Sequence, residues 1–219
     1  MESKCLQTGD QCLESFFANY PEMLICESEV MVAREVLTAV FSSGGKLLVC
    51  GNGGSAADSE HIVGELVKSF RFKRSVDPSF AKAYLEANGE EHPDWLEGSL
   101  PAVSLVSQSA LATAFSNDES AVGLFAQQVY SYGRNGDALL AISTSGNSEN
   151  VVEAAKVARA KGMKVISLTG SKESRLSALA DVCVRVPREE VFRVQELHLP
   201  TYHALCAAIE ADCFGGESR

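Results

Sequence analysis

Two short turns rich in serine and glycine are the first candidates for chemistry in this sequence. They read Gly51-Asn52-Gly53-Gly54-Ser55 and Ser143-Thr144-Ser145-Gly146-Asn147-Ser148. Each follows a short apolar run and precedes a helical pattern, so the N–H groups of a helix N-terminus and several hydroxyl donors would lie together. Such donors suit a phosphate monoester, although the same residue types are also ordinary turn formers. The presence of two equivalent turns favours a phosphate site.

A histidine and a glutamate after the first turn form the second candidate. His61 and Glu65 are four residues apart in a helical pattern, so they share one face. This spacing suits a divalent metal or an acid–base pair, and it is also common in surface salt links. Near the other end of the chain, Gln195 and His203 are eight residues apart, about 80° around a helix. Both can therefore face one site, whereas His198 points elsewhere on the same helix.

An alternation of apolar runs and helical patterns positions these candidates. Two helices are predicted near the start of the chain, at 13–24 and 30–41. The predicted strands are 46–50, 101–106, 137–142, 164–168 and 182–186, and the predicted later helices are 55–70, 110–115, 119–132, 149–161, 173–180 and 191–214. Strands that alternate with helices predict an α/β fold: a doubly wound, five-stranded, mostly parallel sheet in a three-layer αβα sandwich, with additional N-terminal helices within 1–43. Ligands of such sheets bind beyond the carboxyl ends of the strands, where the strand order reverses.

One segment, residues 71–100, interrupts the alternation. It opens with the cations Arg71, Lys73 and Arg74, then becomes acidic, and it contains the only tryptophan, Trp95. Its length suits either a surface excursion or a lid that shapes a substrate site. We therefore expect a single domain over 1–219 in which 71–100 is an insertion.

Composition and charge limit the possible partners. A chain of 219 residues can form one sizeable core. Its formal net charge of −10 repels nucleic acid and anionic membranes, and it has no apolar run of about 18 residues, so neither partner is expected. Seven cysteines without a CxxC pair, and first residues unlike a signal peptide, predict reduced thiols in the cytoplasm.

Apolar residues in the opening helices predict self-association. They are Leu13, Phe16, Phe17, Met23, Leu24 and Ile25. One sheet of this size has limited surface to cover these residues and the long apolar C-terminal helix as well. We therefore expect helices to pack across subunits in a closed, symmetric homo-oligomer.

Taken together, the motifs resemble the sugar isomerase (SIS) domain family. The matching blocks are Cys50-Gly51-Asn52-Gly53-Gly54-Ser55, His61…Glu65, Asn117-Asp118, Ile142-Ser143-Thr144-Ser145-Gly146-Asn147-Ser148 and Gln195-Glu196-Leu197-His198…His203. They occur in the family's order, and the resemblance covers nearly the whole chain outside 71–100. The glutamate and histidine blocks resemble the phosphoheptose isomerase branch. This resemblance implies an aldose–ketose isomerase that converts sedoheptulose 7-phosphate to D-glycero-D-manno-heptose 7-phosphate through an enediol.

The resemblance also implies roles for individual residues. Glu65 matches the catalytic carboxylate, which would move the carbon proton, and His203 matches the catalytic imidazole, which would serve the oxygens. Zinc binds in metal-containing members at the positions of His61, Glu65, Gln195 and His203. The positions that would bind substrate are Asn52, Gly53, Ser55, Asp118, Ser143, Thr144, Ser145, Ser148 and Gln195. The family further implies a homotetramer with active sites at subunit interfaces.

Two other functions fit the same scaffold. A non-catalytic SIS regulatory or scaffold protein would lack the glutamate and the histidine, whereas this chain has both Glu65 and His203. An enzyme acting on another sugar phosphate would retain them. The inserted segment 71–100 leaves the identity of the sugar open between these enzymes.

Overall fold

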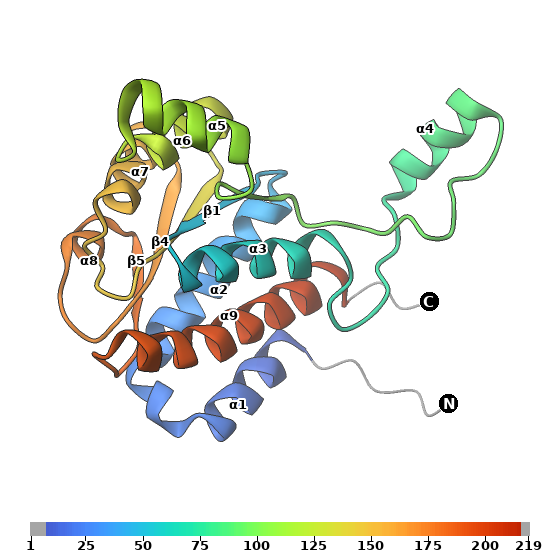
Figure 1. Ribbon diagram of the computed structural model, residues 1–219. Coiled ribbons are helices and arrows are strands. Elements are labelled where there is room, and N and C mark those ends of the chain that lie inside the picture. Colours follow the sequence, from blue (N-terminus) through green and yellow to red (C-terminus); the bar gives the residue numbers. More distant parts are fainter. Residues whose placement is uncertain (1–7, 216–219) are drawn as a thin grey trace.

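A five-stranded sheet forms the centre of the computed structural model, which describes residues 8–215 (Figure 1). Its strands are β1 (Leu47–Gly51), β2 (Ala102–Ser104), β3 (Ala138–Ile142), β4 (Lys164–Thr169) and β5 (Val182–Arg185). They lie in the order β2-β1-β3-β4-β5, and every neighbouring pair is parallel. The predicted α/β fold with a doubly wound sheet is confirmed, and the sheet is wholly rather than mostly parallel.

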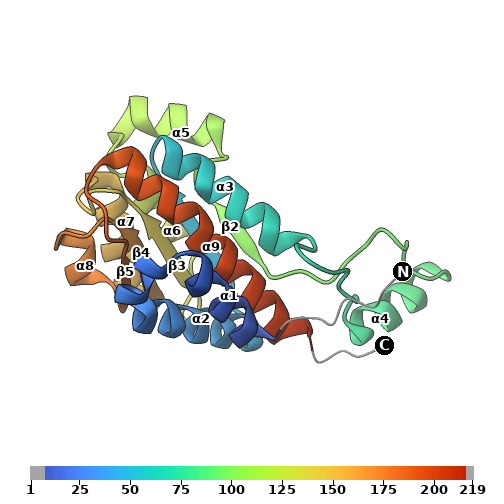
Figure 2. The same ribbon diagram turned by 90° about the horizontal axis from the view of Figure 1, so that it is seen from below.

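Helices cover both faces of this sheet, which gives the predicted three layers (Figure 2). One face carries α1 (Gly9–Asn19), α2 (Glu27–Ser42), α3 (Gly54–Val67) and α9 (Val191–Phe214), and the other carries α6 (Leu124–Tyr132), α7 (Glu149–Ala160) and α8 (Arg175–Leu179). The remaining described elements are η1 (Pro21–Cys26), α4 (Pro78–Asn88), α5 (Ser109–Phe115) and the π-helical turn η2 (Ser116–Ser120). Within residues 8–215, none of the helices combines the length and the apolar character needed to cross a bilayer.

Alternation along the strands divides the core into two halves. Leu47 and Val49 of β1 pack with α1, α2, α3 and α9, whereas Leu48 and Cys50 pack with the helices of the opposite layer. Side chains of β3 and β4 divide in the same way. Both faces of the sheet are therefore buried, which explains why its strands read as continuous apolar runs.

The chain opens differently from the predicted single helix at 13–24. Helix α1 ends at Asn19, and the 3₁₀-helix η1 begins at Pro21. A residue before proline disfavours the α conformation, and proline has no N–H to continue the helix, so the break falls at Tyr20.

Most of the apolar residues in this opening region are covered by the chain itself. Leu13, Phe16, Phe17 and Met23 lie in the core of the same chain, where α1 packs against α9. The expectation that these four residues need a second subunit is therefore wrong. Leu24 and Ile25 of η1 stay exposed, at 52% and 76%.

The inserted segment 71–100 contains a helix that the sequence analysis missed. Asp77 caps α4 by accepting hydrogen bonds from the backbone N–H groups of Ser79 and Phe80, and Gly89 ends the helix in the left-handed conformation. No residue of α4 is buried. The helix projects away from the α/β body instead of folding over it (Figures 1 and 2), so within one chain it does not form the lid considered above.

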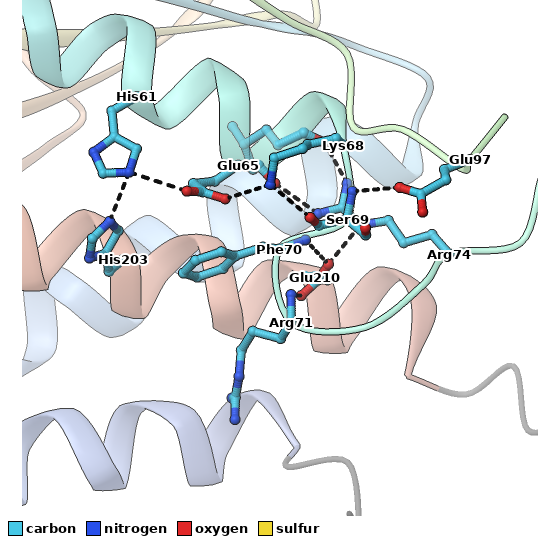
Figure 3. A network of polar contacts seen from close by, with 11 residues as sticks. His61, Glu65, Lys68, Ser69, Phe70, Arg71, Arg74, Glu97, His203 and Glu210 are labelled. Atoms are coloured by element: carbon cyan, nitrogen blue, oxygen red, sulfur yellow. Dashed lines mark hydrogen bonds and ion pairs between the residues drawn. The ribbon is translucent and has the colours of Figure 1, made fainter. Parts of the chain in front are cut away.

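A buried ion pair holds the base of this segment and joins α3 to α9. Arg74 Nε lies 2.8 Å from Glu210 Oε1, and both side chains are 0% exposed. The two terminal nitrogens of Arg74 donate to the carbonyl oxygens of Leu66 at 2.5 Å and Glu65 at 2.9 Å, in the last turn of α3. Glu210 in turn accepts from the backbone N–H groups of residues 70 and 71 (Figure 3). The ion pair thus supplies partners for carbonyl groups that a helix end leaves unpaired.

His198 is a second buried polar side chain of α9. It is 0% exposed. Burial lowers the pKa of His198 to about 4, so the ring is neutral at physiological pH. It therefore belongs to the core, as its helical position predicted.

Removing one partner of the buried ion pair should strongly destabilise the fold. We expect Glu210→Ala to lower the free energy of unfolding, measured in urea, by about 3–5 kcal/mol, because Arg74 is left as an uncompensated buried charge. Arg74→Met combined with Glu210→Leu should lower the free energy of unfolding by less than Glu210→Ala does, because it leaves no buried charge without a partner. Lys156→Ala, which breaks the partly exposed pair with Glu153, serves as the control and should cost less than about 1 kcal/mol. A loss of under 1 kcal/mol in Glu210→Ala would contradict this role.

Candidate active site

The two serine-glycine turns lie side by side at one edge of the sheet. β1 and β3 are neighbours, and Gly51 at the end of β1 is paired with Ile142 at the end of β3. One turn leads from β1 into α3 and the other from β3 into α7. The strand order reverses between β1 and β3, and this is the place where doubly wound sheets bind ligands.

Glycine allows the backbone of both turns to bend sharply. Gly53 has φ +57° and Gly146 has φ +65°, which are conformations that side chains disfavour. Gly54 has a different constraint, since a Cβ there would come within 2.3 Å of Gln195 Nε2. The amide of Gln195 therefore lies directly against the first turn of α3.

Hydroxyl and amide groups connect the two turns. Ser143 Oγ and Ser148 Oγ are 2.9 Å apart. Asn52 and Asn150 exchange two amide hydrogen bonds of 2.8 and 2.9 Å, one in each direction. Asn150, which the sequence analysis did not single out, thereby fixes one turn relative to the other.

The other predicted hydroxyls differ in their exposure. Ser55 is buried at the start of α3, Thr144 is half-buried, and Ser145 is exposed, with its Oγ accepting from the N–H of Asn147 at 3.2 Å. Ser145 is thus accessible to an anion at the N-terminus of α7, where backbone N–H groups and the helix dipole favour negative charge.

Three potential metal ligands meet on the facing sides of α3 and α9. His61 Nε2 lies 3.2 Å from Glu65 Oε1 and 3.3 Å from His203 Nε2 (Figure 3). One ligand atom from each residue lies within 4.8 Å of the others. Zinc bonds of about 2.0–2.1 Å in a tetrahedral site place neighbouring ligand atoms about 3.3 Å apart, so these donors fit a divalent ion. All three residues come from one chain, so the pairing of Glu65 with His203 does not require a second subunit.

Burial sets the protonation of the imidazole on α9. The ring of Phe70 lies 5.6 Å from that of His203, centroid to centroid. Burial and the neighbouring His61 lower the pKa of His203, and Glu65 partly opposes this shift. A neutral imidazole has one N–H and one lone pair, so His203 can give one proton and can use its lone pair either to take a proton or to bind a metal ion.

Further polar groups surround the pair on α3. Lys68 Nζ lies 3.3 Å from Glu65 Oε2, opposite the oxygen that faces His61. On the other side of the His61 ring, the hydroxyl of Tyr202 contacts His61 Nδ1 and Asp58. Burial raises the pKa of Tyr202, with Asp58 adding to the shift, so its hydroxyl keeps its proton.

Two predicted site residues lie apart from the three-ligand group. Gln195 is placed against Gly54, and none of the described hydrogen bonds connects it to His61 or His203. Asp118 lies on the π-helical turn η2, is exposed, and accepts a hydrogen bond from its neighbour Asn117. Their assignments as metal-binding and substrate-binding residues remain predictions.

Known proteins resemble this chain over most of its length. The SIS domain model matches residues 26–92 and 96–170. A phosphoheptose isomerase of Rhodospirillum rubrum is 36% identical over 185 residues, which are 84% of this chain and 86% of that protein. One of Dechloromonas aromatica is 39% identical over 191 residues, 86% of each chain.

Solved structures extend the similarity to the fold. The structure of a phosphoheptose isomerase from Neisseria gonorrhoeae superposes with a TM-score of 0.71 at 34% identity, covering 91% of this chain and 94% of that one. Identity is above 30% over more than four-fifths of both chains in each of these comparisons. This chain therefore belongs to the phosphoheptose isomerase family of SIS-domain proteins.

Proposed function

We propose that this protein is an aldose–ketose isomerase that converts sedoheptulose 7-phosphate to D-glycero-D-manno-heptose 7-phosphate. The observation that carries this proposal is the meeting of Glu65 on α3 with His203 on α9, in a chain of the phosphoheptose isomerase family whose two phosphate-type turns lead into α3 and α7. A non-catalytic regulatory protein would not need this carboxylate–imidazole pair.

The reaction requires proton transfer at carbon and at oxygen. The carboxylate of Glu65 takes the proton from C1 of the ketose, and an enediol forms as the C2 carbonyl oxygen gains a proton. The same carboxylate returns a proton to C2, while the hydroxyl at C1 loses its proton to give the aldehyde. His203 serves the two oxygens in turn, because a neutral imidazole can accept a proton at one oxygen and deliver one to the other.

The phosphate end of the sugar would bind at the sheet edge. Ser55, Ser143, Ser145 and Ser148, together with the N-termini of α3 and α7, provide uncharged donors for a dianion. Thr144, Asn52 and Gly53 belong to the same two turns. Neutral donors are suited to this task because they bind phosphate without offsetting the charge of Glu65 in the neighbouring proton-transfer site.

A divalent metal ion, zinc, completes the proposed site. His61, Glu65 and His203 would hold it, with Gln195 as the fourth ligand that the family resemblance implies. When bound, the ion supplies Lewis-acid polarisation of the substrate oxygens.

We also propose a cytoplasmic homotetramer with active sites near subunit interfaces. Exposed apolar residues remain on η1, at Leu24 and Ile25, and at the start of α9, at Val191 and Phe192. Such patches commonly mark interfaces between subunits. All six cysteines within residues 8–215 are free thiols, which is typical of a reducing compartment.

The reaction is tested with sugar phosphates of five to seven carbons. We expect the wild-type protein to isomerise sedoheptulose 7-phosphate fastest, and Glu65→Gln to lower kcat by at least about 100-fold, because an amide cannot accept the carbon proton. Glu60→Gln, on the same helix and hydrogen-bonded to Ser107, is the control and should retain activity. Faster turnover of a shorter sugar would indicate another isomerase, and full activity of Glu65→Gln would contradict the mechanism.

Removal of two hydroxyls tests the phosphate turn. Each donor to a charged group contributes about 1.5–3 kcal/mol, so Ser145→Ala combined with Ser148→Ala should raise KM by at least about 10-fold. Ser131→Ala on α6, whose hydroxyl bonds within its own helix, should leave KM unchanged. An unchanged KM in the double variant would exclude this turn from substrate binding.

Light scattering tests the assembly. At micromolar concentration we expect four times the chain mass, because the apolar residues on η1 and α9 would be covered by neighbouring subunits. Leu24→Glu combined with Ile25→Glu should shift the mass downward, whereas Val122→Glu, at another exposed apolar residue, is the control. A monomeric wild-type protein would contradict the proposed tetramer.

A further inference from the structure

The hydroxyl of Tyr202 bridges two side chains of α3 beside the three-ligand group. Its Oη lies 3.0 Å from His61 Nδ1 and 3.2 Å from Asp58 Oδ1. Tyr202 is 1% exposed and directly precedes His203 on α9, while Asp58 lies one turn before His61 on α3. The contacts form a chain from Asp58 through Tyr202 to the His61 nitrogen that is not adjacent to Glu65.

The hydrogen-bonding capacity of these atoms determines the direction of each bond. The hydroxyl of Tyr202 donates its single proton to Asp58 Oδ1, which accepts it. The hydroxyl oxygen is then an acceptor for a proton on His61 Nδ1. A neutral imidazole with its proton on Nδ1 has a free lone pair on Nε2, which is the atom beside Glu65 and His203.

Glu65 competes for the same ring proton. Because Glu65 Oε1 lies 3.2 Å from His61 Nε2, a proton on Nε2 would also have an acceptor. A ring protonated only at Nε2 has no lone pair there for a metal ion. The hydroxyl bridge counteracts this competition, since it gives the Nδ1 proton a hydrogen-bond partner on a buried side chain.

We propose that Asp58 and Tyr202 are positioning residues, which hold His61 in the orientation and tautomer that let Nε2 bind a divalent metal ion. This role rests on the proposed metal site formed with Glu65 and His203. Both residues act through His61, and neither is itself a ligand. The sequence analysis identified neither of them as part of the site.

Tyr202→Phe tests this role because it removes the hydroxyl and keeps the ring, whose centroid lies 5.6 Å from that of His61 and 4.9 Å from that of His203. We expect the Kd of the chelator-treated variant for Zn²⁺, measured by competition with a fluorescent chelator, to rise about 10–100-fold. Asp58→Ala should also raise the Kd, because the hydroxyl is then free to donate to Nδ1. Tyr130→Phe, at a 66% exposed tyrosine on α6, is the matched control and should bind zinc like the wild type.

Nitrogen-15 NMR of histidine-labelled, zinc-loaded protein provides a readout of the His61 Nδ1 proton itself. The wild type should show a His61 Nδ1 proton protected from exchange with water, and Tyr202→Phe should lose this protection. If thermal melting shows that Tyr202→Phe does not fold, the Kd for Zn²⁺ and the exchange of the His61 Nδ1 proton are compared between Asp58→Ala and the wild type instead.

The outcomes separate this role from the isomerase function. Zinc affinity within twofold of the wild type in the folded variants would overturn the role of Asp58 and Tyr202. Failure of the wild type to bind Zn²⁺ would also overturn it, and isomerisation by that protein would leave the proposed function standing. Weakened zinc binding in both variants, with no isomerisation by the wild type, would support the role and contradict the function.

Discussion

The buried contact between Arg74 and Glu210 fixes the two helices that carry the proposed chemistry. Arg74 binds the carbonyl oxygen of Glu65 itself, and Glu210 lies seven residues after His203, two turns along the same face of α9. The ion pair therefore sets both the end of α3 and its position relative to α9 (Figure 3). A carboxylate and an imidazole that must share one substrate depend on this spacing, since small displacements of catalytic groups greatly reduce rates.

The parallel sheet performs a different task from this helix pair. The ends of β1 and β3 place two helix N-termini and several hydroxyls at one edge, where they can hold a phosphate. Facing side chains of α3 and α9 then bring together the proposed proton-transfer groups, two to three turns along α3 from its N-terminus. In the proposed function the fold therefore separates binding of the charged end of the sugar from chemistry at its reactive end, and α3 contributes to both.

Features that depend on neighbouring residues were predictable from the sequence. The five strands, the turns at Gly51 and Ser143 and the shared helical face of His61 and Glu65 follow from local spacing. The effect of proline on its neighbours also predicts a break before Pro21. The apolar pattern on both sides of this proline instead favoured one continuous helix. Helix α4 was missed because none of its residues is buried, so it has no face that packs against the core.

Contacts between distant residues could not be predicted in this way. Arg74 and Glu210 are 136 residues apart, and Tyr202 and Asp58 are 144 apart, so no local period or turn motif links either pair. Arg74 instead resembled one member of a basic surface cluster, and Tyr202 resembled another apolar residue of the last helix. Their partners became evident only when α3 and α9 were placed side by side.

Deuterium exchange at the sugar carbons tests the central claim, that Glu65 on α3 and His203 on α9 act as one proton-transfer unit. Sedoheptulose 7-phosphate incubated with the wild-type protein in D₂O should gain deuterium at C1 of the recovered ketose and at C2 of the aldose, because the carboxylate exchanges its proton with solvent. His203→Ala should form little aldose yet retain some exchange at C1, since Glu65 can still remove the carbon proton. Aldose formed by the wild type with the C1 proton transferred as hydride, and without any solvent deuterium under conditions of repeated turnover, would contradict the account.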